Sequence, residues 1–241
     1  GADPAPGSMT PPLWVDCDNS LGAAFRDVDD GLVLAWLVRQ ARGAVRGVSL
    51  VHGNAPLRVV RSRTAALLHH AGARDLPSWC GAARRGGGES AATRALAAAV
   101  LAEPGRIVVL ALGPLTNLAA AERAQPGLLR RSASVIALGG TLGDRRLGWR
   151  PVRELNFAAD PAAARLVLER APRLTVIPAT SCLDLTLGWA DIGRLPSWLR
   201  RPVALWLAAL IAGRLSTRMV VWDMLAVLAV THAGLLASRP T

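Results

Sequence analysis

The segment at residues 13–35 decides the fold: LWVDCDN at residues 13–19 is followed, after a short polar stretch, by DVDDGLVLA at residues 27–35. The run Leu13–Asp18 is apolar except for Asp16 and Asp18 near its end. Such a run is typical of a strand buried on both faces. Asp29 and Asp30 open the next apolar stretch, where free N–H groups and the helix dipole favour acidic residues. The segment therefore predicts a buried strand followed by a helix, which is the opening unit of a parallel α/β fold.

The same alternation continues along the chain. Further strands are expected at Gly47–Val51, Ile107–Leu112, Ser134–Leu138 and Leu174–Pro178, and helices at Asp29–Ala41, Pro56–Ala71, Glu89–Ala102, Leu115–Arg123 and Asp160–Arg170. The region after Asp191 is predicted to be helical and to be broken at Pro196 and Pro202. The expected fold class is α/β, a Rossmann-like open, mostly parallel sheet with helices on both faces. We expect one domain at residues 9–241, preceded by an expression remnant at residues 1–8.

Composition excludes several classes of function. The 241 residues carry a formal net charge of +11, but every basic side chain is arginine, which suggests a compositional bias of the source genome. The charge is therefore weak evidence for nucleic acid, and no nucleic-acid partner is expected. Three widely spaced cysteines without a C-x-x-C pair indicate buried thiols in a reducing compartment, so we expect a cytoplasmic protein. No apolar stretch is long enough to span a bilayer, so no membrane partner is expected.

Carboxylates gather where the first strand meets the first helix. Ligands of open parallel sheets bind at the carboxyl ends of the strands. Asp16 and Asp18 alternate in direction along a strand, so at most one of them faces that edge. Clustered carboxylates without histidine or thiolate partners favour Ca²⁺ or Mg²⁺. The alternative is ordinary helix capping, which is our interpretation of Asp27 alone.

The motifs along the chain resemble those of the calcium-dependent nucleoside hydrolases, the inosine-uridine preferring type. VDCDN and DVDDGLVLA resemble the family's Asp-x-Asp strand end and the Asp-Asp on the following helix. The later motifs follow in the family's order: GVSLVHGN ending at Asn54, LALGPLTNLA at residues 110–119, IALGG at residues 136–140, ELNFAADPAAA at residues 154–164, and Trp222-Asp223. Each motif alone is weak, whereas the ordered set, spread over residues 12–230, is specific.

The resemblance implies a Ca²⁺-dependent enzyme that hydrolyses the N-glycosidic bond of ribonucleosides, releasing free base and ribose, and that assembles as a homo-oligomer (dimer or tetramer). It implies the following roles: Asp18 as general base and metal contact, Asp30 and Asp223 as carboxylate ligands, the Leu112 carbonyl as a backbone ligand, Asp29 and Asn54 on the ribose hydroxyls, Glu154 and Asn156 on the 5′ side, and Asp16 as support behind them.

Trp222 stands where some relatives of that family carry a histidine, and it resembles the purine-preferring branch. An indole can stack on a purine leaving group. Packing in the core beside Met219–Val221 is the alternative for this side chain, and both interpretations remain open at this point.

Two other functions stay open. Asp16-x-Asp18 after an apolar strand also fits a Mg²⁺-dependent haloacid-dehalogenase-type phosphohydrolase, although that superfamily normally uses a lysine and this chain has none. A degenerate member that binds nucleoside or metal without turnover is the other alternative. It is motivated by the insert Asn19–Arg26, the short loop after Cys80 and the short stretch after Asp223. Within the insert, Asn19 and Arg26 become candidates for contacting substrate, and Trp149 is a candidate neighbour of the sugar.

Overall fold

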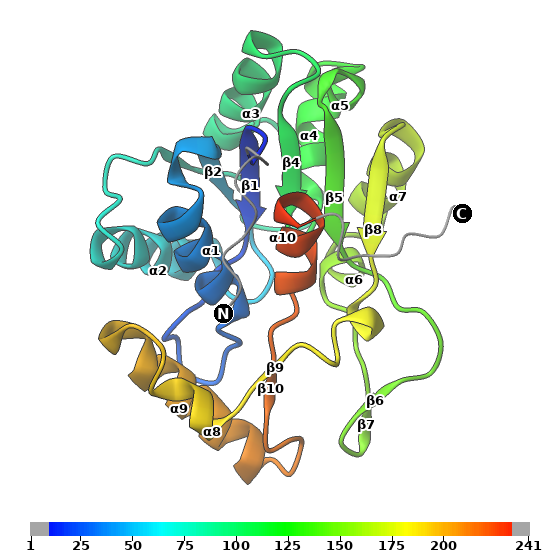
Figure 1. The fold of residues 1–241 in the computed structure, drawn as a ribbon. Coiled ribbons are helices and arrows are strands. Elements are labelled where there is room, and N and C mark those ends of the chain that lie inside the picture. Colours follow the sequence, from blue (N-terminus) through cyan, green and yellow to red (C-terminus); the bar gives the residue numbers. More distant parts are fainter. Residues whose placement is uncertain (1–9, 233–241) are drawn as a thin grey trace.

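A computed structural model describes residues 10–232 of the chain, so the predicted remnant at residues 1–8 lies outside the described residues. Its centre is a six-stranded parallel sheet in the order β3-β2-β1-β4-β5-β8 (Figure 1). The strands are β1 (Leu13–Cys17), β2 (Val45–Leu50), β3 (Ser78–Cys80), β4 (Val108–Ala111), β5 (Ser134–Leu138) and β8 (Leu174–Ile177). The α/β fold class predicted from the sequence is confirmed.

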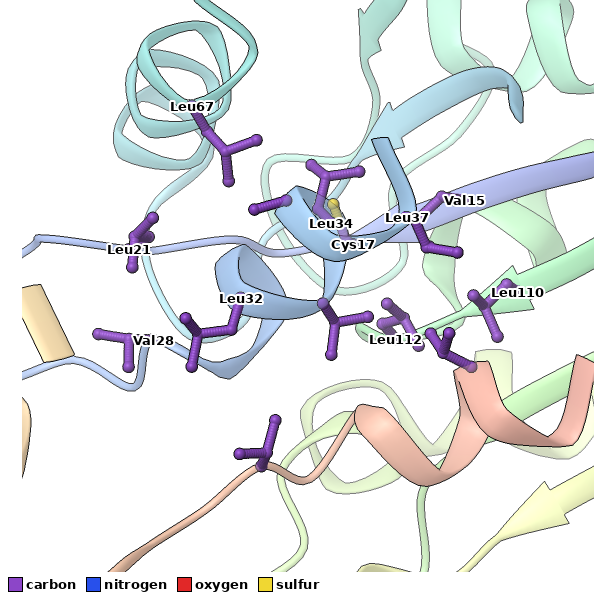
Figure 2. Close-up of a cluster of buried hydrophobic side chains, with 14 of the residues drawn as sticks. Val15, Cys17, Leu21, Val28, Leu32, Leu34, Leu37, Leu67, Leu110 and Leu112 are labelled. Carbon is purple, nitrogen blue, oxygen red and sulfur yellow. The ribbon is translucent and has the colours of Figure 1, made fainter. Parts of the chain in front are cut away.

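Helices cover both faces of the sheet because the strands are apolar on both sides. Leu13, Val15 and Cys17 of β1 pack into one core, and Trp14 packs into the other. The first core is covered by α1 (Asp29–Gln40), α2 (Leu57–His70), α9 (Ser197–Ala212) and α10 (Met224–Thr231), and the second by α3 (Ala91–Ala102), α4 (Thr116–Ala124), α5 (Leu128–Arg131) and α7 (Pro161–Arg170). Figure 2 shows α1 leucines meeting Val15 and Cys17 of β1.

The strand order reverses between β1 and β4. The chain runs outward from β1 through β2 to β3 and then returns to place β4 on the other side of β1. In open α/β sheets, the crevice at such a reversal is where ligands bind. At this edge Figure 1 places the shorter elements: β6 (Arg146–Leu147), β7 (Arg150–Pro151), α6 (Asn156–Ala159), β9 (Thr186–Leu187), α8 (Trp189–Ile192) and β10 (Met219–Val220). The fold thus sets these elements around the end of β1.

The sequence missed one strand, and one local expectation was wrong. The edge strand β3 was not predicted, because three residues without an apolar run carry no strand pattern in the sequence. Pro202 was expected to break a helix, yet it lies inside α9, whereas Pro196 immediately precedes that helix. A proline removes one N–H from the helix ladder, and the buried face of α9, including Leu199 and Val203, offsets that loss by packing on the core. Among residues 10–232, no helix is both long and apolar enough to cross a membrane.

Candidate active site

The two carboxylates at the end of β1 point to different places, as the alternation of a strand requires. Asp18 lines a cavity of about 380 Å³ at the carboxyl edge of the sheet. Asp16 lies fully buried behind it, where its carboxylate accepts hydrogen bonds from Ser49 and from Nδ2 of Asn117 at 2.8 Å. Asp16 therefore lies behind Asp18 and does not line the cavity, and its supporting role stays a prediction.

The loop after β2 is held against Asp18. The backbone N–H of Asn54 donates a hydrogen bond to the Asp18 carboxylate. Gly53 precedes it with a φ of +155°, and a Cβ there would collide with the same carboxylate oxygen. Only glycine allows this approach. The Asn54 side chain also lines the cavity, and its amide donates to the carbonyl of Asp27 at 3.4 Å.

The first turn of α1 contributes two further carboxylates. Asp29 and Asp30 are buried and line the cavity, and Oδ1 of Asp30 accepts a hydrogen bond from the backbone N–H of Asp18 at 3.2 Å. Gly31 follows them without a side chain, and a Cβ there would meet Leu21 at 2.5 Å and Asn19 at 2.8 Å. The glycine therefore lets the insert 19–26 pack directly against the helix that carries the carboxylates.

Asp223 reaches the same place from the far end of the sequence, just before α10. Oxygen atoms of Asp29, Asp30 and Asp223 lie within 4.8 Å of one another, and all three side chains are buried. Both carboxylate oxygens of Asp223 are buried without a hydrogen-bond partner among the described residues. Buried carboxylates are normally paired or bound to a metal, so this oxygen-only group fits a hard divalent cation such as Ca²⁺ or Mg²⁺. Asp18 lies beside this group, next to Asp30.

Burial dominates the electrostatics of these carboxylates. It raises the pKa of Asp18 to about 6 and that of Asp16 to about 7. Burial, together with the neighbouring carboxylates, raises the pKa values of Asp29, Asp30 and Asp223 well above the ordinary range. Like charges held together in a buried site favour protonation or the binding of a cation. The chain therefore concentrates negative charge where a cation would relieve it.

Leu112, directly after β4, lines the cavity, and its carbonyl already has a hydrogen-bond partner. Nδ2 of Asn156 donates to it at 2.7 Å and to the Leu138 carbonyl at 3.0 Å. A carbonyl oxygen has two lone pairs, so the Leu112 carbonyl can still serve a second partner. Asn156 thus ties the ends of β4 and β5 together at the wall of the cavity.

Glu154 also lines the cavity, and its carboxylate is engaged by the following helix. Its two oxygens accept hydrogen bonds from the backbone N–H groups of Phe157 at 2.7 Å and Ala158 at 3.0 Å. The predicted residue of the 5′ side therefore also caps α6.

Trp222 combines the two placements considered from the sequence, in the core and at the substrate site. It is half-buried, packs against the first core and also lines the cavity. Its Nε1 donates to Oδ2 of Asp27 at 3.3 Å. Asp27 was interpreted as a cap, and it does accept hydrogen bonds from the backbone N–H groups of Val28 and Asp29. It additionally lines the cavity and orients the indole, a role that no local pattern indicates.

The structure brings every predicted site residue except Asp16 to one cavity and adds residues that the sequence did not place there. The additional polar and aromatic lining residues include Phe25, Asp27, Arg153 and Trp206. Arg26 was a candidate because it ends the insert, and the structure places it at the cavity.

Two weaker candidates lie elsewhere. Asn19 is fully buried and its amide donates to Thr64, so it does not face the cavity. Trp149 lines an adjoining hollow.

Comparison with known proteins gives consistent results. A model of the family described as inosine-uridine preferring nucleoside hydrolase matches residues 13–241. The putative pyrimidine-specific ribonucleoside hydrolase RihB of Shigella boydii is 37% identical over 87 residues, which are 36% of this chain and 34% of that protein. The match thus spans about a third of that relative's length.

Two solved structures share the fold. A plant nucleoside hydrolase, the PpNRh1 enzyme, superposes with a TM-score of 0.81 at 19% identity, covering 95% of this chain and 80% of the other. A purine-preferring ribonucleoside hydrolase from Gardnerella vaginalis superposes with a TM-score of 0.80 at 18% identity, covering 95% and 82%. At such identities the likeness establishes the α/β fold.

Proposed function

Because the chain belongs to the inosine-uridine preferring nucleoside hydrolase family, we propose that it hydrolyses the N-glycosidic bond of ribonucleosides, with Ca²⁺ as its cofactor. The observation that carries the proposal is the pair of buried, unpartnered Asp223 oxygens beside Asp29 and Asp30. In its ionised form such a group is unfavourable unless it holds a cation. Family membership also favours this activity over a Mg²⁺-dependent phosphohydrolase.

Each residue of the site has a proposed role. Asp30, Asp223 and the Leu112 carbonyl, with Asp18, are the proposed ligands of the cation. A bound Ca²⁺ would supply positive charge that orients the ribose hydroxyls and eases the deprotonation of water. Asp29 and Asn54 would hold the ribose hydroxyls, and Glu154 and Asn156 would hold the 5′ side.

Asp18 is the proposed general base. Breaking the C1′–N bond builds positive charge on the sugar, and a water must lose a proton as it attacks C1′. The Asp18 carboxylate is held in place by the Asn54 N–H and points into the cavity, so it can accept that proton. The surrounding carboxylates are suited to a cationic sugar.

The proposed preference is for purine bases, and it rests on Trp222. The indole lines the cavity, and its orientation is held by the hydrogen bond to Asp27. A fixed aromatic surface of this size can stack on a bicyclic base as it departs. We further propose that the enzyme forms homo-oligomers, as the resemblance implies, and that it is cytoplasmic, as its three widely spaced cysteines suggest.

The direct test is release of free base from a panel of purine and pyrimidine ribonucleosides, in Ca²⁺ and after chelation. We expect turnover in Ca²⁺, loss with chelator, recovery when Ca²⁺ is returned, and faster cleavage of purines. Absence of turnover on every ribonucleoside in Ca²⁺ would contradict the enzymatic proposal and favour a member that only binds nucleoside or metal.

A further inference from the structure

We propose that the cavity accepts nucleosides that carry a 5′-phosphate, and that Arg26 and Arg153 bind this phosphate at the cavity rim. The inference rests on the proposed N-ribohydrolase function and specifies its substrate class. It starts from two cationic side chains in a cavity whose floor is built of carboxylates.

Both arginines are available for a ligand. Arg26 and Arg153 line the cavity from exposed positions, and neither forms an ion pair or a hydrogen bond with another residue of the range 10–232. Other exposed arginines, such as Arg61 and Arg63 on α2, are unpaired within that range as well, but they do not line this cavity. A guanidinium group presents a fork of N–H donors that matches the oxygens of a phosphate.

The position of Arg153 points to the 5′ end of the substrate. It directly precedes Glu154, the residue that the family resemblance assigns to the 5′ side of the sugar. The Glu154 carboxylate is already bonded to two N–H groups of α6, at 2.7 and 3.0 Å. Each oxygen keeps a lone pair for the 5′ oxygen of the sugar. A carboxylate cannot bind a phosphate, however, so the neighbouring guanidinium of Arg153, unpaired among residues 10–232, is the group available for an anionic extension of the 5′ carbon.

There is room for that extension. A second hollow of about 540 Å³ adjoins the cavity and shares Arg153 and Trp222 with it. Its wall adds Trp149 and Arg150, and the Arg150 guanidinium lies 4.4 Å above the Trp149 ring. The space beyond the nucleoside is therefore bordered by cations.

Charge is separated along the cavity. Asp18, Asp29, Asp30 and Asp223 are buried at its floor, whereas Arg26 and Arg153 are exposed at its rim. Asp27 and Glu154 lie half-buried between them and accept hydrogen bonds from backbone N–H groups. A cation and the ribose hydroxyls suit the floor, and an anionic group suits the rim. A nucleoside 5′-monophosphate has this polarity, since its ribose hydroxyls and its phosphate lie at opposite sides of the sugar.

The reaction stays the same with the larger substrate. Water adds across the glycosidic bond: a C1′–O bond forms, the C1′–N bond breaks, and its electron pair leaves with the base, which takes up a proton. The phosphate ester is untouched. The products are free base and ribose 5-phosphate instead of ribose.

The test compares inosine with inosine 5′-monophosphate in Ca²⁺, measuring kcat/KM for base release. We expect the wild-type protein to prefer the nucleotide. In the Arg26→Ala/Arg153→Ala double variant, the ratio of the nucleotide value to the nucleoside value should fall by about tenfold or more. The control is Arg61→Ala, an exposed arginine on α2 outside the cavity, which should leave the ratio unchanged.

Failure of this proposal is distinguishable from failure of the proposed function. Cleavage of inosine without a preference for the nucleotide, or an unchanged ratio in the double variant, would overturn the phosphate proposal alone. If neither compound is cleaved, the proposed function fails. Binding measurements then test the phosphate site by themselves. Calorimetry should then show tighter binding of ribose 5-phosphate than of ribose, with the difference lost in the double variant; equal binding of the two would overturn it.

Discussion

At the scale of a single residue, Asp223 shows how a group suited to bind a cation lowers the stability of the folded protein. Its two buried oxygens have no hydrogen-bond partner among residues 10–232, and Asp29 and Asp30 stand next to it. An unpaired buried charge costs folding free energy, and natural proteins retain such groups where function requires them. A cation that binds the folded state regains that free energy by mass action.

Asp223→Asn tests whether the buried carboxylate lowers the stability of the metal-free protein and binds the cation. Removing the charge should raise the thermal midpoint of the metal-free protein near neutral pH and abolish the increase that Ca²⁺ produces in the wild type. Differential scanning calorimetry with and without Ca²⁺ measures both. The matched control is Asp144→Asn, an exposed aspartate, which should change neither. A variant that still gains stability from Ca²⁺ would remove Asp223 from the ligand set.

Asp18→Asn tests the general base. Asparagine keeps an oxygen that can accept the Asn54 N–H bond, so the fold should persist while the proton acceptor is lost. We expect kcat for base release to fall by about 10²- to 10⁴-fold, the usual contribution of a positioned base. A circular dichroism spectrum and thermal midpoint close to wild type would separate this loss from unfolding. Undiminished turnover would contradict the assignment.

Trp222→Ala tests the origin of base preference. Loss of the indole should reduce kcat/KM for purine ribonucleosides by about tenfold and affect pyrimidine ribonucleosides less, since stacking grows with the area of the base. Trp222→Phe keeps an aromatic ring but loses the Nε1 bond to Asp27, so it should retain part of the preference. Equal losses on both classes of substrate would show that Trp222 acts through the core alone.

At the scale of elements, the contact between the insert 19–26 and α1 depends on Gly31. The missing side chain leaves space that Leu21 and Asn19 fill. Gly31→Ala should push the insert away from the helix and lower the free energy of unfolding by about 1–3 kcal/mol, as overpacking does. Urea denaturation measures the change. Gly88→Ala, where a Cβ meets nothing within 4 Å, should stay within about 0.5 kcal/mol of wild type.

Elements also differ in how well the sequence predicts them. Ser134–Leu138 was predicted with its observed bounds, because a buried central strand is a continuous apolar run between polar residues. The edge strand β3 was missed because its pairing with β2, not its composition, makes it a strand. The continuation of α9 through Pro202 likewise depends on packing against the core, which local propensity does not contain.

At the scale of the whole molecule, the buried carboxylates couple stability to pH. Burial raises the folded-state pKa of Asp18 to about 6 and of Asp16 to about 7, from an ordinary value of 3.8. A carboxyl group with a raised pKa favours the folded state while protonated, so its contribution is complete below the ordinary value and is lost as pH rises through the folded value.

The metal-free protein should therefore lose stability as pH rises between about 4 and 7, and Ca²⁺ should oppose this trend because it favours the ionised carboxylates. Urea midpoints measured across this range, in chelator and in Ca²⁺, test the expectation. A chelated protein that becomes steadily more stable up to pH 7 would contradict it.

The sequence by itself determined the parallel α/β fold, since apolar runs and amphipathic segments alternate in a pattern that only a covered parallel sheet can bury. It also carried the motifs that identify the family and most of the residues at the cavity, because the ends of parallel strands must share one edge. Only the tertiary structure decided that both Asp223 oxygens lie buried beside Asp29 and Asp30 without a partner among the described residues, that Asp27 holds Trp222, and that Arg26 and Arg153 line one cavity. These arrangements join segments far apart in the chain, and packing, which no local pattern encodes, sets their distances.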